Sequence, residues 1–277
     1  MKTLPHKCLY KTAIENYSKP VISRDTVILL QGGGNFGDLW RRHTDFCLRI
    51  INDFPENKII ILPQTVFYRD EKTLLDDAAI MNSHRGLTIC ARDGLSHELL
   101  LEHFHAAKIL LLPDMAFCIS PLSLEKKSRD ARKSVLFLKR GDIELETYNF
   151  EHYLKDRTGI EEHDWPGMQK KLLIFHLLVL LKKLGDIFKG SRLAGSLTRR
   201  LVDRYAVHVF MPGLIKRGIA FLGTYEYIFT TRLHGAILGI LLDKPMTFFD
   251  NAYGKNSSFY NTWLKGTQGI IFIEKEA

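Results

Sequence analysis

The sequence predicts an α/β fold in two domains. The chain has 277 residues, which is long for one compact domain and suits two domains of roughly 100–150 residues each. Short apolar segments alternate with helix-like segments through short connections, a pattern that gives a parallel sheet with helices on both faces. Apolar residues make up 45% of the chain and charged residues 25%, as is ordinary for a soluble globular protein.

The first domain is predicted over residues 1–125. Its strands are short apolar runs expected at residues 25–31, 58–63, 87–92 and 108–113. Helices are expected between them at residues 38–54, 71–82 and 94–103. Asp93 stands directly before the last of these helices and is expected to cap it.

The second domain is predicted over residues 126–277. A polar, charged linker at residues 120–133 leads into it. Strands are expected at residues 134–139, 227–231, 245–249 and 269–273, with a helix at residues 235–242.

A glycine-rich segment follows the first strand. It reads Gln31-Gly-Gly-Gly-Asn-Phe-Gly-Asp38, and we expect a tight loop that opens a helix. Backbone N–H groups in such a loop favour an anion or polar ligand, which makes Gly33, Gly34 and Asn35 candidate binding residues. The spacing is not that of a dinucleotide site. Glycines chosen only for turn geometry are the alternative.

A second motif, Thr231-Arg-Leu-His-Gly235, joins an apolar strand to a helix. Arg232 offers a planar fork of donors for a carboxylate or phosphate. His234 is able to donate, accept or bind a proton near neutral pH, and Gly235 would allow close backbone approach. The alternative makes Arg232 a surface ion-pair partner and His234 an ordinary helix residue.

Other polar residues follow strands as well. Arg140 follows the first strand of the second domain and would reach the same site as Arg232 if their strands are neighbours; a solvated charge cluster is the alternative. Structural roles are favoured for Arg92 and Asp114, and His43, alone in a helix, is a weak candidate.

The positive charge is concentrated in one segment. Residues 168–218 hold eleven Lys and Arg against two Asp, a net charge of +9. The whole chain has a net charge of +8, so the rest of it carries −1. The leucine-rich helical spacing fits a solvated face over an ordinary core, or peripheral contact with an anionic membrane. Nucleic-acid binding is ranked last, because aromatic residues are few among these charges: Phe175, Phe188, Tyr205 and Phe210.

The four cysteines form no CxxC pair and no zinc-like cluster, so no metal site is predicted. We see neither a signal-peptide pattern nor an apolar run of 18 residues. A cytoplasmic protein is expected, held at the inner face of the membrane if the basic segment binds lipid.

Taken together, the motifs resemble those of the polysaccharide pyruvyl transferase family. They occur in the order GGGNFGD, LPQT, ARD, PDMAF, TTRLHGAILGILLDKP and DNAYGKN. The resemblance implies two Rossmann-like domains facing a cleft, similar to the GT-B glycosyltransferases. It also implies transfer of a pyruvyl group from phosphoenolpyruvate to a sugar of a polysaccharide, or of its lipid-linked precursor, to form a cyclic ketal.

The resemblance further implies roles for particular residues. Arg232, Leu233 and His234 would form the donor site, Asp38 would act on a sugar hydroxyl, and Arg140 would assist at the donor. The residue chemistry agrees, since two arginines suit a donor that carries both a phosphate and a carboxylate. No cofactor is expected beyond phosphoenolpyruvate as donor substrate.

Two other functions stay open at this point. A GT-B-like glycosyltransferase would use the same arginine and histidine for the diphosphate of a nucleotide sugar. A non-catalytic protein of polysaccharide assembly would instead act through the basic segment on the membrane surface.

Overall fold

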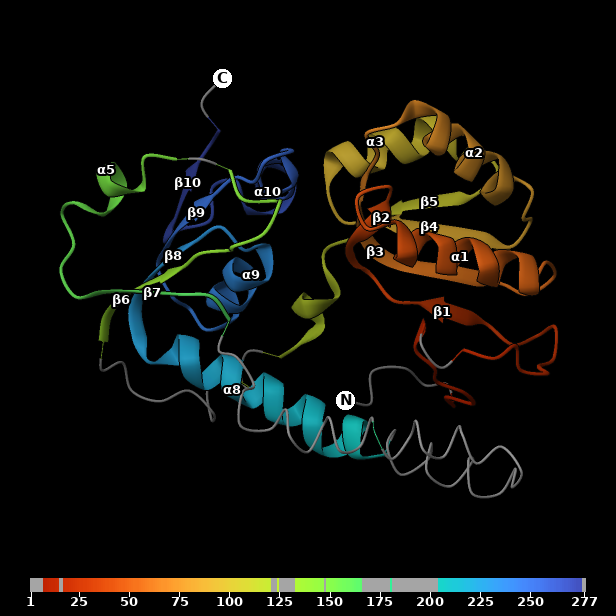
Figure 1. Ribbon diagram of the computed structural model, residues 1–277, viewed down its shortest axis with the longest axis horizontal. Helices are drawn as coiled ribbons and strands as arrows, with labels where there is room; N and C mark the ends of the chain where they lie inside the picture. Colours follow the sequence, from red (N-terminus) through yellow and green to blue (C-terminus); the bar gives the residue numbers. More distant parts are fainter. Residues whose placement is uncertain are drawn as a thin grey trace. The chain divides into compact units, whose positions relative to one another are not determined.

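Two parallel sheets organise the chain (Figure 1). The computed structural model describes residues 7–14, 17–120, 124, 133–146, 148–165, 180 and 204–275. The chain forms two units: unit 1 comprises Met1–Met115 and Ser258–Lys265, and unit 2 comprises Ala116–Ser257 and Gly266–Ala277. The chain therefore enters unit 2, returns briefly to unit 1 and ends in unit 2.

Unit 1 contains a five-stranded sheet in which every pairing is parallel, as the alternating pattern predicts. Its strands are β1 (Ile28–Leu30), β2 (Gly33–Gly37), β3 (Ile59–Phe67), β4 (Leu87–Ala91) and β5 (Lys108–Leu111). The order is β1-β3-β4-β5, and β2 pairs with the later part of β3. The side chains of Ile59, Ile61 and Ile89 are fully buried in this sheet.

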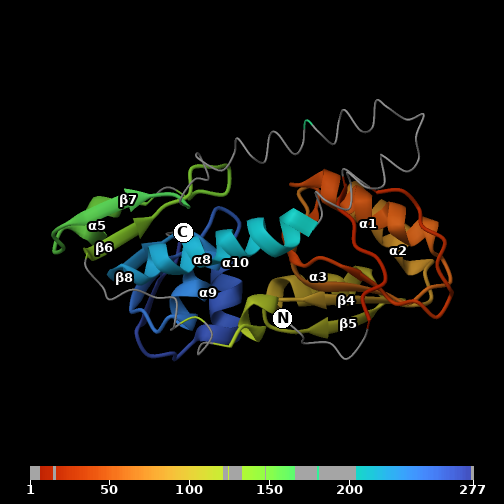
Figure 2. The ribbon, with the colours of Figure 1, turned by 90° about the horizontal axis from the view of Figure 1, so that it is seen from below.

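Three helices of unit 1 lie close to their predicted positions: α1 (Arg41–Asp53), α2 (Glu71–Asn82) and α3 (Gly94–His103) (Figure 2). Two short helices were not predicted: η4 (Tyr260–Leu264) in unit 1 and η2 (Met115–Cys118), which lies in unit 2 apart from its first residue. The predicted helix cap is confirmed, because the Asp93 side chain accepts a hydrogen bond from the Ser96 N–H. Asp70 caps α2 in the same way, through the Thr73 N–H.

The glycine-rich segment differs from the expected loop, because Gly33–Gly37 forms strand β2 against β3. A Cβ on Gly32 would lie 2.3 Å from the Pro63 carbonyl oxygen, and one on Gly37 would lie 1.8 Å from that of Phe67. Gly37 also has a φ of 124°, which favours glycine. The glycines thus allow the backbone to lie directly on β3.

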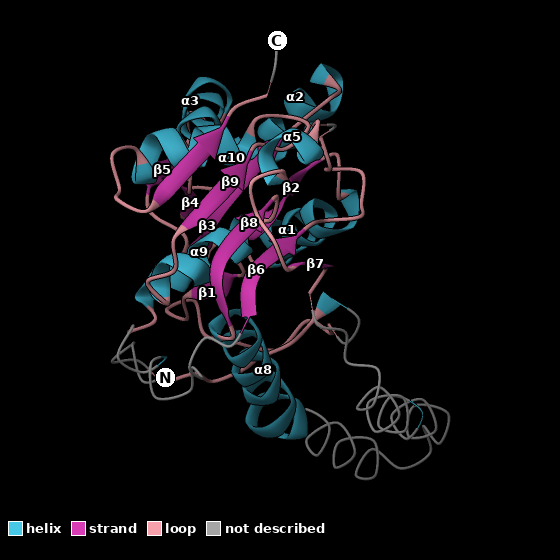
Figure 3. Ribbon diagram, turned by 90° about the vertical axis from the view of Figure 1, so that its left-hand side faces the viewer, coloured by secondary structure: helices cyan, strands magenta, loops and turns pink. Residues whose placement is uncertain are grey.

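Unit 2 contains a second five-stranded parallel sheet, in the order β10-β9-β8-β6-β7. Four of its strands, β6, β7, β8 and β9, are labelled in Figure 3. Its strands are β6 (Lys133–Leu138), β7 (Ile160–His163), β8 (Tyr225–Thr230), β9 (Met246–Phe249) and β10 (Ile270–Ile273). Four of these match predicted strands. Edge strand β7 was not predicted, since Ile160-Glu-Glu-His163 has one apolar residue in four.

Side chains alternate between the two faces of this sheet, as the strand period of two requires. On one face, Val135, Phe137, Phe229 and Phe249 pack with aromatic residues around α5 (Phe150–Leu154). On the other, α8 (Met211–Gly223) and α9 (Leu233–Leu241) pack against β8 and each other. Both faces of the sheet are therefore covered.

The remaining described helices of unit 2 are η3 (Ala206–Phe210) and α10 (Lys255–Phe259), which runs on into unit 1. Most of the predicted linker lies outside the described residues. The same holds for residues 168–203 of the basic segment, apart from Leu180. Within the part of the chain that is described, no helix has the length and apolarity to cross a bilayer.

Candidate functional site

Arg140 and Arg232 lie together at the carboxyl edge of the second sheet. They follow β6 and β8, which are paired neighbours. The Arg140 N–H donates to the Thr231 hydroxyl at 3.0 Å, and the Thr231 N–H donates to the Leu138 carbonyl at 3.3 Å. These bonds join the two strand ends, so the two arginines enter the site from one rigid edge.

The Arg140 guanidinium is almost fully buried and is occupied by carboxylates of its own loop. Its Nε and Nη2 donate to Asp142 at 2.7 and 3.0 Å, and its Nη1 donates to Glu144 at 2.7 Å. Burial works against the charged form, but the bond to Asp142 and the charge of Glu144 raise the pKa of Arg140. Arg140 thus anchors the loop after β6.

Lys255 completes this buried charge cluster. Its ammonium group, from the start of α10, also donates to Glu144, and both side chains are about 5% exposed. Burial alone would raise the pKa of Glu144, but the charge and hydrogen bond of Lys255, together with Arg140, lower it. Glu144 therefore stays ionised between two cations.

Arg232 is more accessible, with 20% of its side chain exposed. Its Nε and Nη2 donate to the two oxygens of Asp164 at 2.5 and 2.6 Å. On its other side, Nη1 lies 3.9 Å from Asp142. The guanidinium therefore has a carboxylate on each side, and Asp142 stands between the two arginines.

The other predicted residues of this motif form the first turn of α9. Leu233 is buried, whereas the His234 side chain is exposed. A Cβ on Gly235 would lie 2.6 Å from the Leu138 side chain and 2.8 Å from the Thr230 hydroxyl. Leu233 and Gly235 thus face the core, whereas the Arg232 side chain is partly exposed and that of His234 is exposed.

In unit 1, the Asp38 carboxylate follows β2. Its Oδ2 accepts from the Arg69 and Asp70 N–H groups at 2.6 and 2.8 Å, which fixes its orientation. Its Oδ1 is buried and has no hydrogen-bond partner among the described residues. Such an oxygen is short of a donor, which a ligand hydroxyl or a water would supply.

The expected cradle of backbone N–H groups is largely used within unit 1. The Gly37 N–H donates to the Thr44 hydroxyl at 2.8 Å, and the Asp38 N–H donates to the Phe67 carbonyl at 3.3 Å. Gly33, Gly34 and Asn35 belong to β2, where Asn35 is exposed. Their predicted role in binding stays a prediction.

Arg92 and Asp114 form a buried ion pair at 2.6 Å, and Arg92 also donates to the Thr65 hydroxyl. With Arg92 only 1% exposed, the pair holds β3, β4 and the end of β5 together, as the structural interpretation proposed. His43 is exposed on α1.

Sequence comparison decides the family. The family model described as polysaccharide pyruvyl transferase matches residues 2–253. The chain belongs to the polysaccharide pyruvyl transferase family. As a member, it is a transferase of polysaccharide biosynthesis.

Two relatives illustrate the likeness to other members. EpsO of Bacillus subtilis (strain 168), provisionally named a pyruvyl transferase, is 31% identical over 90% of this chain and 72% of its own length. Pyruvyl transferase 1 of Schizosaccharomyces pombe (strain 972 / ATCC 24843) is 29% identical over 88% of this chain. The chain spans only 57% of the length of the yeast protein.

A solved structure supports the α/β fold of this pyruvyl transferase family member. It is that of a functionally uncharacterised protein of Klebsiella pneumoniae subsp. pneumoniae NTUH-K2044, with a TM-score of 0.57 and 22% identity. The match covers 91% of this chain and 76% of the other.

The site prediction for this family member omitted Asn256, although the motif DNAYGKN contains it. Its side-chain amide donates to the Thr231 and Phe249 carbonyls at 3.2 and 2.9 Å, with the residue fully buried. Asn256 thereby ties α10 to the ends of β8 and β9. The signal in the sequence was its place in the motif, since its partner Thr231 is 25 residues away.

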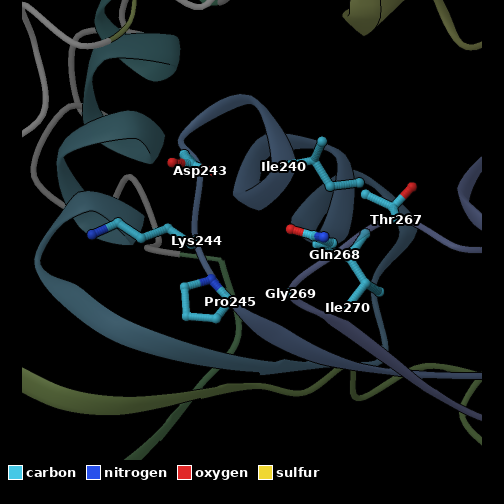
Figure 4. A pocket seen from close by; sticks show the side chains of 8 residues that line it. All are labelled: Ile240, Asp243, Lys244, Pro245, Thr267, Gln268, Gly269 and Ile270. Carbon is cyan, nitrogen blue, oxygen red and sulfur yellow. The ribbon is translucent and has the colours of Figure 1, made fainter.

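Two pockets in the described part of unit 2 lie at the amino edge of the sheet, opposite the edge that carries the two arginines. One of about 270 Å³ is lined by residues before β9 and β10, including Asp243, Lys244 and Gln268 (Figure 4). None of the predicted site residues lines it. Among the described residues, no group of three or more His, Cys, Asp and Glu has the arrangement of a metal site.

Proposed function

We propose that this transferase moves the pyruvyl group of phosphoenolpyruvate onto two hydroxyls of a sugar to form a cyclic ketal. The observation that carries the proposal is the position of Arg232, 20% exposed at the carboxyl edge of the second sheet, two residues before the exposed His234. Ligands of open α/β sheets gather at this edge. Family membership and relatives named as pyruvyl transferases support the same reaction.

In the proposed reaction, the methylene carbon of phosphoenolpyruvate gains a proton. Two sugar hydroxyls lose their protons and form two C–O bonds to the central carbon, while the bond from that carbon to the phosphate oxygen breaks. One of the two protons appears on the methyl group and the other leaves with phosphate. His234 is the proposed proton donor or phosphate partner, because its side chain is exposed in the first turn of the helix that follows Arg232.

The donor's anionic groups would be held mainly by Arg232. The Arg140 guanidinium already binds Asp142 and Glu144 and is 7% exposed. Its role is therefore to fix Asp142 beside Arg232 rather than to receive the donor. This refines the two-arginine clamp expected from the sequence into one contact arginine and one supporting arginine.

Asp38 is the proposed acceptor-side residue. Its Oδ2 is fixed by two backbone N–H groups, and its Oδ1 lacks a partner among the described residues. A sugar hydroxyl would satisfy this oxygen and pass its proton toward it. The similarity to GT-B glycosyltransferases that the sequence resemblance implies stays part of this proposal.

Replacing Arg232 tests the proposal. In Arg232→Ala, we expect phosphate release from phosphoenolpyruvate with acceptor present to fall by about 100-fold or more, since the charge clamp is lost. Arg157→Ala is a matched control, because Arg157 is exposed and stacks on Tyr227 near the opposite sheet edge. Near-normal turnover in Arg232→Ala would rule the assignment out.

The identity of the donor is tested separately. Thermal unfolding with phosphoenolpyruvate or a nucleotide sugar distinguishes the proposed donor from that of a glycosyltransferase, because a bound ligand stabilises the folded state. Mass spectrometry of products from candidate sugars then identifies the acceptor.

We further propose that the acceptor is lipid-linked and that residues 168–218 contact the anionic inner face of the cell membrane. Val209, Met211 and Ile215 are apolar and about half exposed in the described part of this segment, and the segment carries a net charge of +9. Such a surface binds anionic lipid through buried apolar area and charge. Flotation with phosphatidylglycerol liposomes tests this, and absence of salt-sensitive binding contradicts it.

A further inference from the structure

Three cations, Arg140, Lys255 and Arg232, form a cluster at the carboxyl edge of the second sheet, and each of them is paired with a carboxylate. Arg140 binds Asp142 and Glu144, Lys255 binds Glu144, and Arg232 binds Asp164. Three positive charges thus face three negative ones within this cluster. A donor with a carboxylate and a phosphate needs unpaired positive charge, so one of these carboxylates must give way when it binds.

Exposure identifies the carboxylate that is able to move. The Glu144 side chain is 5% exposed, so removing it from Arg140 and Lys255 would leave buried charges without partners. The Asp164 side chain is 47% exposed, so its carboxylate is open to solvent. Moving Asp164 away from Arg232 therefore needs little free energy, because exposed ion pairs are weak.

The geometry of the Asp164 contact matches that of a ligand. The two carboxylate oxygens take the Nε and Nη2 donors of Arg232 side by side, at 2.5 and 2.6 Å. A substrate carboxylate or phosphate uses the same pair of donors when it binds arginine in bidentate fashion. Both cannot occupy that edge of the guanidinium at once.

We infer that Asp164 is an internal competitor of the anionic donor. It holds Arg232 in place in the free protein and is exchanged for the donor's anionic group on binding. The inference rests on the proposed function for the identity of the donor, but its physical content is the competition for Arg232. Asp164 is thus a positioning residue that sets the affinity for anions.

The test compares Asp164→Asn with Glu162→Gln in the full chain, by calorimetric titration with phosphoenolpyruvate and, separately, with inorganic phosphate. Asparagine keeps the oxygen that accepts from the Trp165 N–H but loses the charge. Glu162 is exposed on β7, two residues before Asp164, and pairs with Lys139 rather than Arg232, so Glu162→Gln removes the same charge from a nearby position without uncovering Arg232.

We expect Asp164→Asn to lower the Kd of the donor by roughly threefold to tenfold, with a parallel fall in KM and little change in the unfolding temperature. Glu162→Gln should change the Kd by less than about twofold. Adding Arg232→Ala to Asp164→Asn should abolish the gain, which separates competition for Arg232 from a general change of charge.

The possible outcomes separate the two proposals. Equal or weaker binding of both anions by Asp164→Asn overturns the competition, because it would show that Asp164 only supports the active position of Arg232. If phosphate binds more tightly to Asp164→Asn while phosphoenolpyruvate binds neither protein, the competition stands and the proposed donor fails. Failure of both anions to bind either protein contradicts both.

Discussion

Glu144 is the residue around which the charged edge of unit 2 is built. It is 4% exposed and accepts from both Arg140 and Lys255. A buried carboxylate is unfavourable unless cations and hydrogen bonds compensate it. Here they more than compensate, because the pKa of Glu144 falls below its ordinary value despite the burial.

Neutralising Glu144 should therefore be destabilising in a pH-dependent way. A carboxylate with a folded pKa below its unfolded pKa stabilises the protein above the unfolded value, and this stability is lost as the pH falls toward the folded pKa. We expect Glu144→Gln to lower the free energy of unfolding by about 3 kcal/mol at pH 7. The difference from wild type should shrink as the pH falls below the ordinary value of 4.5.

Urea unfolding between pH 3 and pH 8 measures this difference. Glu151→Gln is the control, because Glu151 is exposed on α5 and its replacement should have little effect at any pH. A loss of stability in Glu144→Gln that is the same at every pH would show that packing, rather than charge, is what the substitution removes.

Helix α10 holds the Arg232 motif in place through hydrogen bonds. Asn256, in its first turn, donates to the carbonyls of Thr231, directly after β8, and of Phe249, the last residue of β9. Thr231 in turn binds Arg140. A short helix thus sets the position of the strand-to-helix junction that carries Arg232.

Removing the Asn256 side chain should disturb the site as well as the fold. In Asn256→Ala, two buried carbonyls lose their donor, which we expect to lower the free energy of unfolding by about 2 kcal/mol. Because Thr231 is released, kcat for phosphate release should also fall. Asn261→Ala, at an exposed position on η4, is the control and should change neither the free energy of unfolding nor kcat. Unfolding and steady-state kinetics of the two variants measure this, and loss of stability without loss of kcat would make Asn256 purely structural.

The sequence predicted the main elements because apolar runs and helix caps are local signals. It also indicated that Arg140 would reach the site of Arg232 if their strands were neighbours, and β6 and β8 are paired. The partners that decide the chemistry were not predictable: Asp164 is 68 residues from Arg232, and Lys255 is 111 from Glu144. Strand β2 was missed because glycine has low strand propensity and gains its place only by lying on β3.

The segment Ser258–Lys265, where the chain returns to unit 1, stabilises the start of helix α3 there. The first N–H groups of a helix lack partners within the helix. In α3, the Ser96 N–H binds the Asp93 side chain, but the Leu95 and Gly94 N–H groups bind the hydroxyls of Ser258 and Thr262 at 3.0 Å. The segment Ser258–Lys265 therefore caps a helix of the first unit from more than 160 residues away.

Loss of this long-range cap should weaken the start of α3 locally. In Thr262→Val, the shape is kept but the Gly94 N–H loses its acceptor, so we expect the free energy of unfolding to fall by about 1 kcal/mol. Amide hydrogen exchange should rise at the start of α3 while β3 stays protected, because the loss is local. Thr267→Val, at an exposed position in unit 2, is the control. Unchanged exchange at Gly94 and Leu95 would mean that water replaces the hydroxyl. Packing, such as that of fully buried Phe259, would then hold the segment Ser258–Lys265 in unit 1, rather than capping.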